Sequence, residues 1–235
     1  DEGAGLWRIR TASGEEVTAD LLVSAVGQLN RPSIPAIPGL ERFRGERFHS
    51  ARWNHAYDLA NKRVAVIGNA ASAIQFIPQI APRVRDLTIF QRSANWMLPR
   101  RDREYSAREK RLFRRSPLLT RLYRWLLWLS YELQFPAFRG NRFMQAMMRK
   151  VALKNIEEHV ADPTLRAALV PDYPIGAKRV LISDDYYQAL GRANVRVVTS
   201  GIDHLTEDAI VSRDGVAHPV DAVILATGFQ STAFL

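Results

Sequence analysis

The chain has 235 residues and a formal charge of +9, and its contents of 47% hydrophobic and 24% charged residues are ordinary for a globular protein. This composition excludes a mostly disordered or collagen-like chain, and the absence of cysteine excludes disulfides, thiolate metal sites and a cysteine nucleophile. The positive charge is concentrated between Arg100 and Lys150, where 14 Lys and Arg stand against 4 Asp and Glu, so the rest of the chain is close to neutral.

The first part of the chain predicts a hairpin followed by a linker. Strands are expected at Leu6–Thr11 and Leu21–Val26, with a Ser-Gly turn between them. The segment from Gly27 to Leu40 contains prolines among small residues, which predicts an irregular linker or a crossing between domains. The aromatic segment from Arg42 to Leu59 has no clear periodicity, so we expect a loop there.

A βαβ unit is predicted next. Arg63–Ile67 is a short apolar run typical of a buried strand, and it ends at Gly68. Apolar residues at helical spacing predict a helix over Ala70–Ile80, and Leu87–Phe90 supplies a second strand.

Residues 100–172 differ in character, because they are rich in arginine, aromatic residues and methionine. We expect two or three helices here, inserted into an α/β scaffold. Apolar positions fit one stripe of a helix at Leu118, Leu119, Leu122, Trp125, Leu126 and Leu129. Strands return at Val195–Val198, Ile210–Ser212 and Val220–Leu225.

The turn after the first buried strand carries the clearest chemistry. A dinucleotide-binding turn has the pattern G-x-G-x-x-G/A, in which the glycines allow a sharp turn, close approach of the pyrophosphate and packing of the helix on the strand. The first and third positions fit, whereas the second is Ala70, which weakens the match; a strand-to-helix turn that binds nothing is the alternative. The candidate cofactor-binding residues here are Gly68, Asn69, Ala70, Ala71, Ser72, Ala73 and Gln75.

The residue after the second strand indicates which nucleotide is preferred. NAD sites place an acidic residue there for the ribose hydroxyls, but this chain has Arg92. A guanidinium suits the 2′-phosphate of NADPH; the alternative is a solvated arginine.

Four segments resemble the Baeyer–Villiger monooxygenase family of flavin-dependent (class B) monooxygenases. Residues 43–54 resemble its fingerprint F-x-G-x-x-x-H-x-x-x-W-P/D at Phe43, Gly45, His49 and Trp53, with Asn54 in place of Pro or Asp. Three further segments are similar to family segments in the same order: the nucleotide turn, the segment Gln91–Trp96 and the segment Pro174–Arg179. The A-T-G-[FY] crossing of these enzymes is resembled by Ala226, Thr227 and Gly228. A degenerate second copy of this crossing is resembled by residues 24–27.

The resemblance implies an α/β fold with a Rossmann-like, three-layer NADP-binding domain, a helical insertion and partial strands of a second, FAD-binding domain. We expect residues 1–40 to be a remnant of the FAD domain and a linker, residues 41–205 the NADP-binding domain with its insertion at about 100–172, and residues 206–235 strands that return to the FAD domain. No G-x-G-x-x-G turn for FAD precedes Val26. We therefore expect a piece or a truncated homologue that binds FAD weakly or not at all by itself.

The family also implies roles for individual residues. Arg179 matches the catalytic residue credited with stabilising the anionic, oxygen-activated flavin, and arginine keeps its charge at any working pH. Lys178 would contact the NADPH phosphates or ribose. The fingerprint His49 is expected to couple the domains and Trp53 to pack, and no metal site is assigned. The implied cofactors are NADPH and FAD, and the implied partners are a small organic substrate and O2.

Other functions stay open at this stage. An N- or S-oxidising flavin monooxygenase is the nearest alternative. The other is a non-catalytic α/β module whose basic insertion makes peripheral contact with a membrane. The resemblance instead implies a folded insertion that lines substrate access, and we expect no nucleic-acid partner. The lack of cysteine suits a reducing compartment, so a cytoplasmic protein is expected.

Overall fold

The computed structural model describes residues 3–231, which fall into two compact units. The two ends of the chain form one unit, within Asp1–Ser33 and Gly228–Leu235, and Ile34–Thr227 forms the other. The last four residues of the region predicted to return to the FAD domain, 232–235, lie outside the described residues.

The first unit contains an antiparallel hairpin of β1 (Trp7–Arg10) and β2 (Glu16–Ala19), with Trp7 opposite Ala19. The first predicted strand is confirmed, whereas the second, at Leu21–Val26, is wrong. The turn is short and closed by a hydrogen bond from the Gly14 N–H to the Thr11 carbonyl (3.0 Å), so pairing resumes at Glu16. It ends before the apolar residues 21–23, which are exposed.

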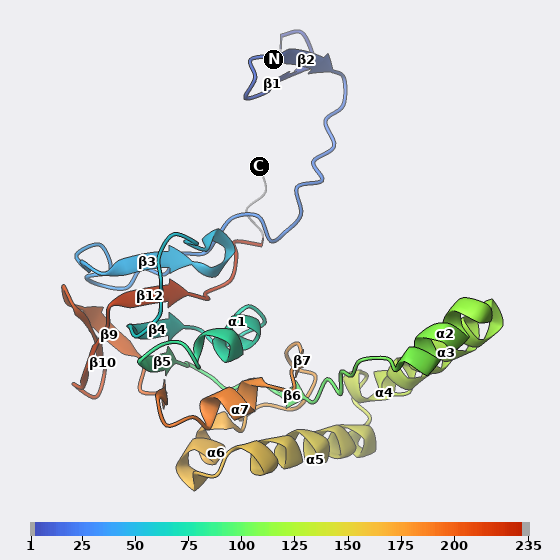
Figure 1. Cartoon of the computed structure of the whole chain (residues 1–235). Helices are drawn as coiled ribbons and strands as arrows, with labels where there is room; N and C mark the ends of the chain where they lie inside the picture. The colour runs from blue at the N-terminus through green and yellow to red at the C-terminus, as the bar shows by residue number, and fades with distance from the viewer. Residues whose placement is uncertain (1–2, 232–235) are drawn as a thin grey trace. The chain divides into compact units, whose positions relative to one another are not determined.

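The second unit is organised by a five-stranded parallel sheet in the order β3-β12-β4-β5-β8 (Figure 1). Its strands are β3 (Glu46–His49), β12 (Ala222–Leu225), β4 (Arg63–Ile67), β5 (Asp86–Phe90) and β8 (Val195–Val198). The helix α1 (Ala73–Ile80) joins β4 to β5, so the predicted βαβ unit is confirmed, with the helix starting three residues later than expected.

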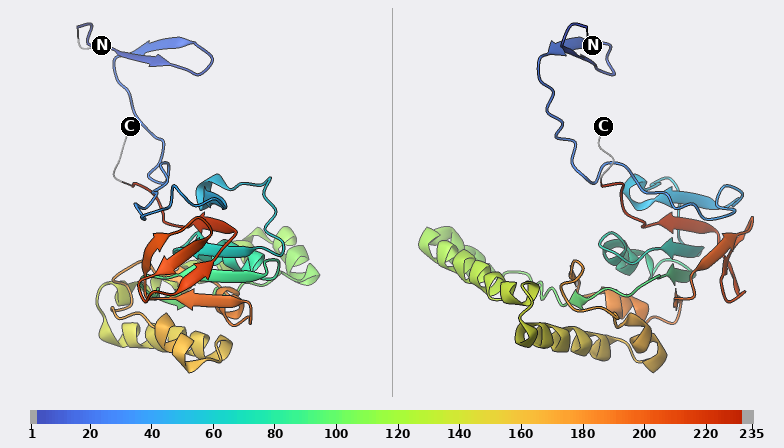
Figure 2. Two further views of the ribbon diagram at one scale, coloured as in Figure 1. Left: turned by 90° about the vertical axis from the view of Figure 1, so that its left-hand side faces the viewer. Right: turned by 180° about the vertical axis from the view of Figure 1, so that it is seen from behind.

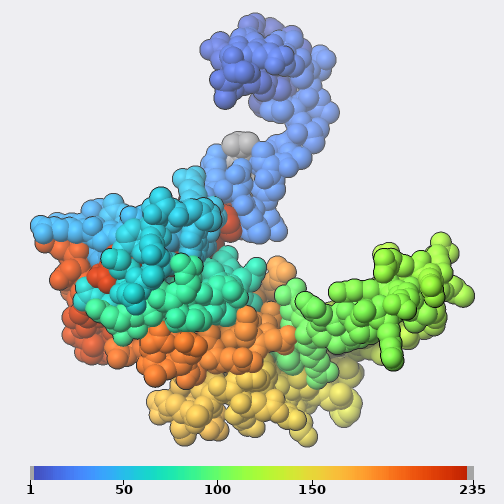
Figure 3. All heavy atoms as spheres, in the orientation of Figure 1, coloured from blue at the N-terminus to red at the C-terminus, as the bar shows by residue number. Residues whose placement is uncertain are grey.

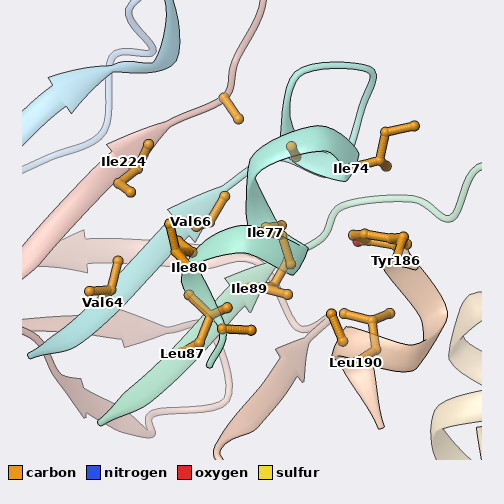
Figure 4. Close-up of a cluster of buried hydrophobic side chains, with 14 of the residues drawn as sticks. Val64, Val66, Ile74, Ile77, Ile80, Leu87, Ile89, Tyr186, Leu190 and Ile224 are labelled. Atoms are coloured by element: carbon orange, nitrogen blue, oxygen red, sulfur yellow. The ribbon is translucent and has the colours of Figure 1, made fainter. Parts of the chain in front are cut away.

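The central strands are apolar on both faces because both faces are covered. On β4, Val64 and Val66 point to one hydrophobic cluster, while Ala65 and Ile67 belong to another. The first cluster includes Ile74 and Ile77 of α1 and residues of α7 (Tyr186–Leu190), as Figure 4 shows. The apolar spacing of α1 thus matches the face that packs on the sheet.

The opposite face is covered by a three-stranded antiparallel sheet in the order β11-β10-β9. Its strands are β9 (Ile202–Leu205), β10 (Ala209–Ser212) and β11 (Ala217–Pro219). Leu205 and Ile210 join the second hydrophobic cluster with residues of β4, β5 and β12. The layers are therefore helices, parallel sheet and antiparallel sheet, which confirms the predicted three-layer α/β class.

Strand β3 corrects the prediction of a loop at Arg42–Leu59. Four of these residues pair in parallel with β12, and a 3-10 helix, η1 (Ser50–Arg52), follows directly. Phe48 and His49 are buried while Arg47 is exposed. The strand was missed because its partner lies about 170 residues further along the chain and because only two adjacent positions are buried.

Among the described residues, the insertion contains five helices, whereas two or three were predicted. They are α2 (Ala107–Arg115), α3 (Pro117–Glu132), α4 (Phe135–Phe138), α5 (Arg142–His159) and α6 (Pro163–Leu169). Ser116 caps α3 and Pro117 occupies its first turn, which separates α3 from α2; Asn141 and Asp162 begin α5 and α6 in the same way. The short strands β6 (Met97–Leu98) and β7 (Leu181–Ile182) pair at the base of the insertion.

None of the helices within the described residues combines the length and the apolar character that crossing a membrane requires.

Candidate nucleotide-binding site

The turn after β4 requires glycine at its first position. Gly68 has a φ of +107°, and a Cβ there would meet the carbonyl oxygen of Ala226 at the end of β12. The Gly68 N–H donates to the Phe90 carbonyl at 3.0 Å, and the Ala226 N–H donates to the Ile67 carbonyl at 2.9 Å. The ends of three parallel strands therefore meet at this turn.

Hydrogen bonds of Asn69 connect the turn to the loop after β5. Its side-chain amide donates to Gln91 Oε1 at 2.8 Å and to the Ser93 carbonyl at 2.9 Å, and the Asn95 amide donates to the Asn69 carbonyl at 3.2 Å. Gln91 is buried, and its amide also donates to the Ala168 carbonyl of α6 at 2.9 Å. This network fixes the loop that carries Arg92 against both the turn and the insertion.

The remaining residues of the turn leave its outer side open. Ala70 is exposed, Ala71 and Ser72 are half-buried, and Ala73 packs in the first hydrophobic cluster. Ser72 occupies the N-cap position of α1 without a side-chain capping bond. Gln75 donates to the Ala71 carbonyl at 2.8 Å. Within the first turn of α1, Ile74 and Gln75 already donate their N–H groups to the carbonyls of Ala70 and Ser72, at 3.1 and 3.2 Å. An anion would therefore meet the N–H groups of residues 70–73 and the positive end of the helix dipole.

Arg92 lies directly after β5 and is exposed. Within the described residues its guanidinium forms no ion pair. Arg92 is therefore an uncompensated cation, among the described residues, on the loop that Asn69 connects to the turn.

Lys178 and Arg179 precede β7 and are both exposed. The Lys178 Nζ lies over the Tyr173 ring at 4.3 Å from its centroid. Tyr173 in turn donates its hydroxyl to the Ala94 carbonyl at 3.0 Å, and burial raises the pKa of that hydroxyl, so it stays a neutral donor. Arg179 forms no ion pair in the part of the chain described.

The fingerprint residues lie at the edge of the same sheet. Phe43 is buried in the second cluster, and a Cβ on Gly45 would meet the Phe43 ring and, at 2.5 Å, the Asp221 carbonyl oxygen. Glycine is therefore required where the chain passes close to the start of β12.

The contacts of His49 and Trp53 are those of residues that support the fold. His49 is buried opposite Leu225 of β12, and its Nδ1 accepts the Ala51 N–H at 3.1 Å as the N-cap of η1. Trp53 packs edge to face on Phe48 and on Phe76 of α1, with ring centroids 5.1 and 5.2 Å apart. The fingerprint thereby links the edge strand to the helix that follows the nucleotide turn.

The departure at Asn54 has a simple local explanation. Its Oδ1 accepts the Ala56 N–H at 3.0 Å, and its amide donates to Glu46 Oε1 at 2.9 Å. An Asp could make the first of these bonds but not the second, whereas Asn makes both.

The A-T-G segment is divided between the two units. Ala226 and Thr227 end the second unit beside Gly68, while Gly228 belongs to the first. Gly228 has a φ of +78°, and its carbonyl accepts the Ser33 N–H at 2.9 Å. The two parts of this segment are therefore described in different units.

The structure brings the turn, Arg92 and Lys178 into one connected network and adds residues that the sequence did not reveal. Gln91, Asn95 and Tyr173 make the connecting bonds. The family resemblance included Gln91, but its hydrogen bonds could not be predicted because its partners lie on other elements. Among the described residues, the hydrogen bonds and ring contacts of this network do not include the Arg179 side chain.

The sequence profile of the family described as "Flavin-binding monooxygenase-like" matches residues 2–235. A "Baeyer-Villiger monooxygenase" of Streptomyces coelicolor is 47% identical over 226 residues, covering 96% of this chain and 43% of that protein. The crystal structure of cyclohexanone monooxygenase from Rhodococcus sp. Phi1 bound to NADP+ superposes with a TM-score of 0.80 at 27% identity, over 97% of this chain and 50% of that one. OTEMO in complex with FAD and NADP gives a TM-score of 0.77 at 28% identity, over 97% of this chain and 51% of that one. The chain thus spans about half the length, or slightly less, of the proteins that it matches.

Proposed function

Because this chain belongs to the flavin-binding monooxygenase-like family, we propose that it is the NADPH-binding portion of a flavin-dependent monooxygenase. The reaction is of the Baeyer–Villiger type, in which one oxygen atom from O2 is added to a ketone or a heteroatom of a small organic substrate. The names of the similar proteins support this type of reaction. We propose contact of the basic insertion with a membrane separately from this reaction.

The observation that carries the proposal is the junction of the nucleotide turn with Arg92. Gly68 turns sharply at the carboxyl ends of β4 and β12, where ligands of parallel α/β sheets bind. Asn69 and Gln91 hold the loop of Arg92 beside this turn. A pyrophosphate at the start of α1 and a 2′-phosphate at Arg92 would each meet donors that the protein leaves available.

The residues present fit NADPH. The start of α1 has no side-chain cap, and Arg92 and Arg179 have no ion-pair partner within the described residues. Bound NADPH supplies a hydride to the flavin. The chain's own part is to hold the dinucleotide: the turn at residues 70–73 by its N–H groups, Arg92 and Lys178 by charge, and Gln75 and Ser72 by hydrogen bonds of their side chains.

Arg179 is proposed as the catalytic cation. It is exposed on a segment anchored through Tyr173, and it cannot lose its proton at working pH. A fixed positive charge there favours an anionic reacting group over its protonated form, which is the electrostatic contribution that this chain makes to oxygen transfer.

The domain division stays a proposal. Residues 41–205 are assigned to NADPH binding, with the insertion at about 100–172, and residues 1–40 and 206–235 to the FAD-binding domain. The pairing of β12 with β4 favours extending the NADPH-binding domain to Leu225. Ala226, Thr227 and Gly228 then form the crossing toward the FAD domain.

Titration of the purified chain with NADPH and NADH tests the proposal. We expect NADPH to bind more tightly than NADH, and Arg92→Ala to weaken NADPH binding by about ten-fold while changing NADH binding little, since one charge-assisted contact to phosphate is lost. Arg42→Ala, an exposed arginine away from the turn, is the matched control and should change neither. Equal losses for the two nucleotides would refute the role of Arg92, and binding of neither would refute the proposed function.

A further inference from the structure

The helices α2 and α3 form a basic hairpin, defined here as residues 106–133, that buries none of its helical residues. Figures 1 and 2 show these helices side by side and directed away from the sheet, and Figure 3 shows their atoms as a protruding arm. The hairpin is therefore the part of the second unit that contributes least to its core.

One face of α3 is apolar and has no partner among residues 3–231, which the structure describes. At 100° per residue, five side chains fall within a sector of about 100°. All of them are at least 50% exposed, and they are Leu118, Leu122, Trp125, Leu126 and Leu133. This is a continuous apolar strip along the whole helix, not a set of scattered surface residues.

The opposite side of α3 packs on α2 and keeps this strip facing outward. Tyr105, Phe113 and Tyr123 form an aromatic cluster with centroid distances of 5.3 to 5.9 Å. Thr120 donates its hydroxyl to the Phe113 carbonyl at 3.1 Å, and Ser106 and Glu109 form a capping box at the start of α2. The hairpin is held by contacts that do not involve the apolar strip.

The hairpin also carries an uncompensated positive charge. It contains seven Lys and Arg against two Glu, and Glu109 is already paired with Arg103 at 2.6 Å. None of the seven forms an ion pair with a described residue. Arg121 lies one helical turn from both Leu118 and Trp125, so charge borders the apolar strip.

We propose that the basic hairpin binds an anionic membrane surface, with the apolar strip of α3 lying at the boundary between headgroups and acyl chains. An interfacial helix combines a Trp- and Leu-rich face with Lys and Arg, which is the composition found here. The 16 residues of α3 extend about 24 Å, which suits a helix that lies flat on the surface. A second copy of the hairpin is a poorer partner because it would bring the same excess of cations together.

Flotation of the purified full chain with lipid vesicles tests the proposal. We expect the chain to bind vesicles of phosphatidylcholine with about 30% phosphatidylglycerol and to bind little to phosphatidylcholine alone. Binding to the anionic vesicles should be weaker at about 0.5 M salt than at about 0.1 M salt, because salt screens the charges. The double variant Arg114→Gln, Arg115→Gln should lower the partition coefficient by about 25-fold, at roughly five-fold for each cation. The matched control is the double variant Arg83→Gln, Arg85→Gln, which removes two exposed arginines outside the hairpin.

The apolar strip is tested by Leu122→Ser with Trp125→Ser. We expect vesicle binding to fall by at least about ten-fold while NADPH binding is unchanged. Trp7→Ser removes an equally exposed tryptophan from the other unit and should have no effect. The proposal is overturned if the wild type does not float, if the hairpin and control variants float equally, or if the strip variant abolishes self-association in the absence of lipid and leaves flotation intact.

Discussion

The helices α1 and α3 have the same kind of apolar spacing and opposite surroundings. Ile74, Ile77 and Ile80 of α1 are buried against the parallel sheet, whereas the apolar strip of α3 is exposed. Periodicity therefore predicts a helix and identifies its apolar side, but it does not tell whether that side meets a partner within the same chain. In α1 the stripe completes the core beneath the candidate nucleotide turn, whereas in α3 it is exposed and no described residue covers it.

The largest expected effect comes from truncating one residue of each stripe. Ile77→Ala leaves a cavity beneath the sheet and should lower the free energy of unfolding by about 2–5 kcal/mol. Leu122→Ala removes a half-exposed side chain and should lower it by less than about 0.5 kcal/mol. Urea unfolding followed by far-UV circular dichroism measures both. Similar losses for the two variants would show that the strip of α3 is covered within the chain.

A second pair of variants compares the glycine of the turn before α1 with a glycine of the insertion, Gly140, between α4 and α5. Gly68 and Gly140 both have positive φ, but a Cβ on Gly68 meets the Ala226 backbone while one on Gly140 meets nothing within 4 Å. We expect Gly68→Ala to cost about 2–4 kcal/mol, from conformational strain and a steric clash, and Gly140→Ala about 1–2 kcal/mol from strain alone. Thermal unfolding checks this order, and a smaller loss at Gly68 would contradict the close crossing of the turn over β12.

The same contrast explains how much the sequence could predict. The unit β4-α1-β5 was predicted because its signals are local: a continuous apolar strand, a glycine and a helical stripe. The break between α2 and α3 also has a local signal, the N-cap residue Ser116 before Pro117. Strand β3 was missed because β12, its partner, is distant in the chain.

The candidate site was predicted residue by residue from its turn and its family resemblance, but its connections were not. Gln91 reaches the Ala168 carbonyl and Tyr173 reaches the Ala94 carbonyl, each across nearly 80 residues of chain. Such bonds depend on how the insertion returns to the sheet, which no local pattern encodes. For the same reason, the sequence predicted that Arg92 and Lys178 bind the cofactor, but not the network that connects their segments.

The smallest expected effect is the loss of stability when one of two ion pairs with the same N–O distance is removed. Arg63 and Asp221 pair at 2.6 Å between β4 and β12, where both are about one-third exposed, and the Asp221 carboxylate also accepts the Arg63 N–H at 2.8 Å. Arg103 and Glu109 pair at 2.6 Å on the surface of the basic hairpin. Asp221→Asn should lower the free energy of unfolding by about 1–2 kcal/mol at pH 7. Glu109→Gln should leave the stability of the sheet unchanged, since its pair lies outside the core.

The pH dependence of the first pair provides the sharper measurement. Hydrogen bonds from Arg63 hold the pKa of Asp221 below its ordinary value. A carboxyl group whose pKa is lower in the folded state stabilises the fold above the unfolded-state pKa, about 3.9, and loses this contribution as the pH falls through the folded-state value. The difference in stability between wild type and Asp221→Asn should therefore be full at pH 7 and shrink toward pH 3 in urea unfolding experiments. A difference that stays constant over this range would show that the pair contributes through packing rather than through charge.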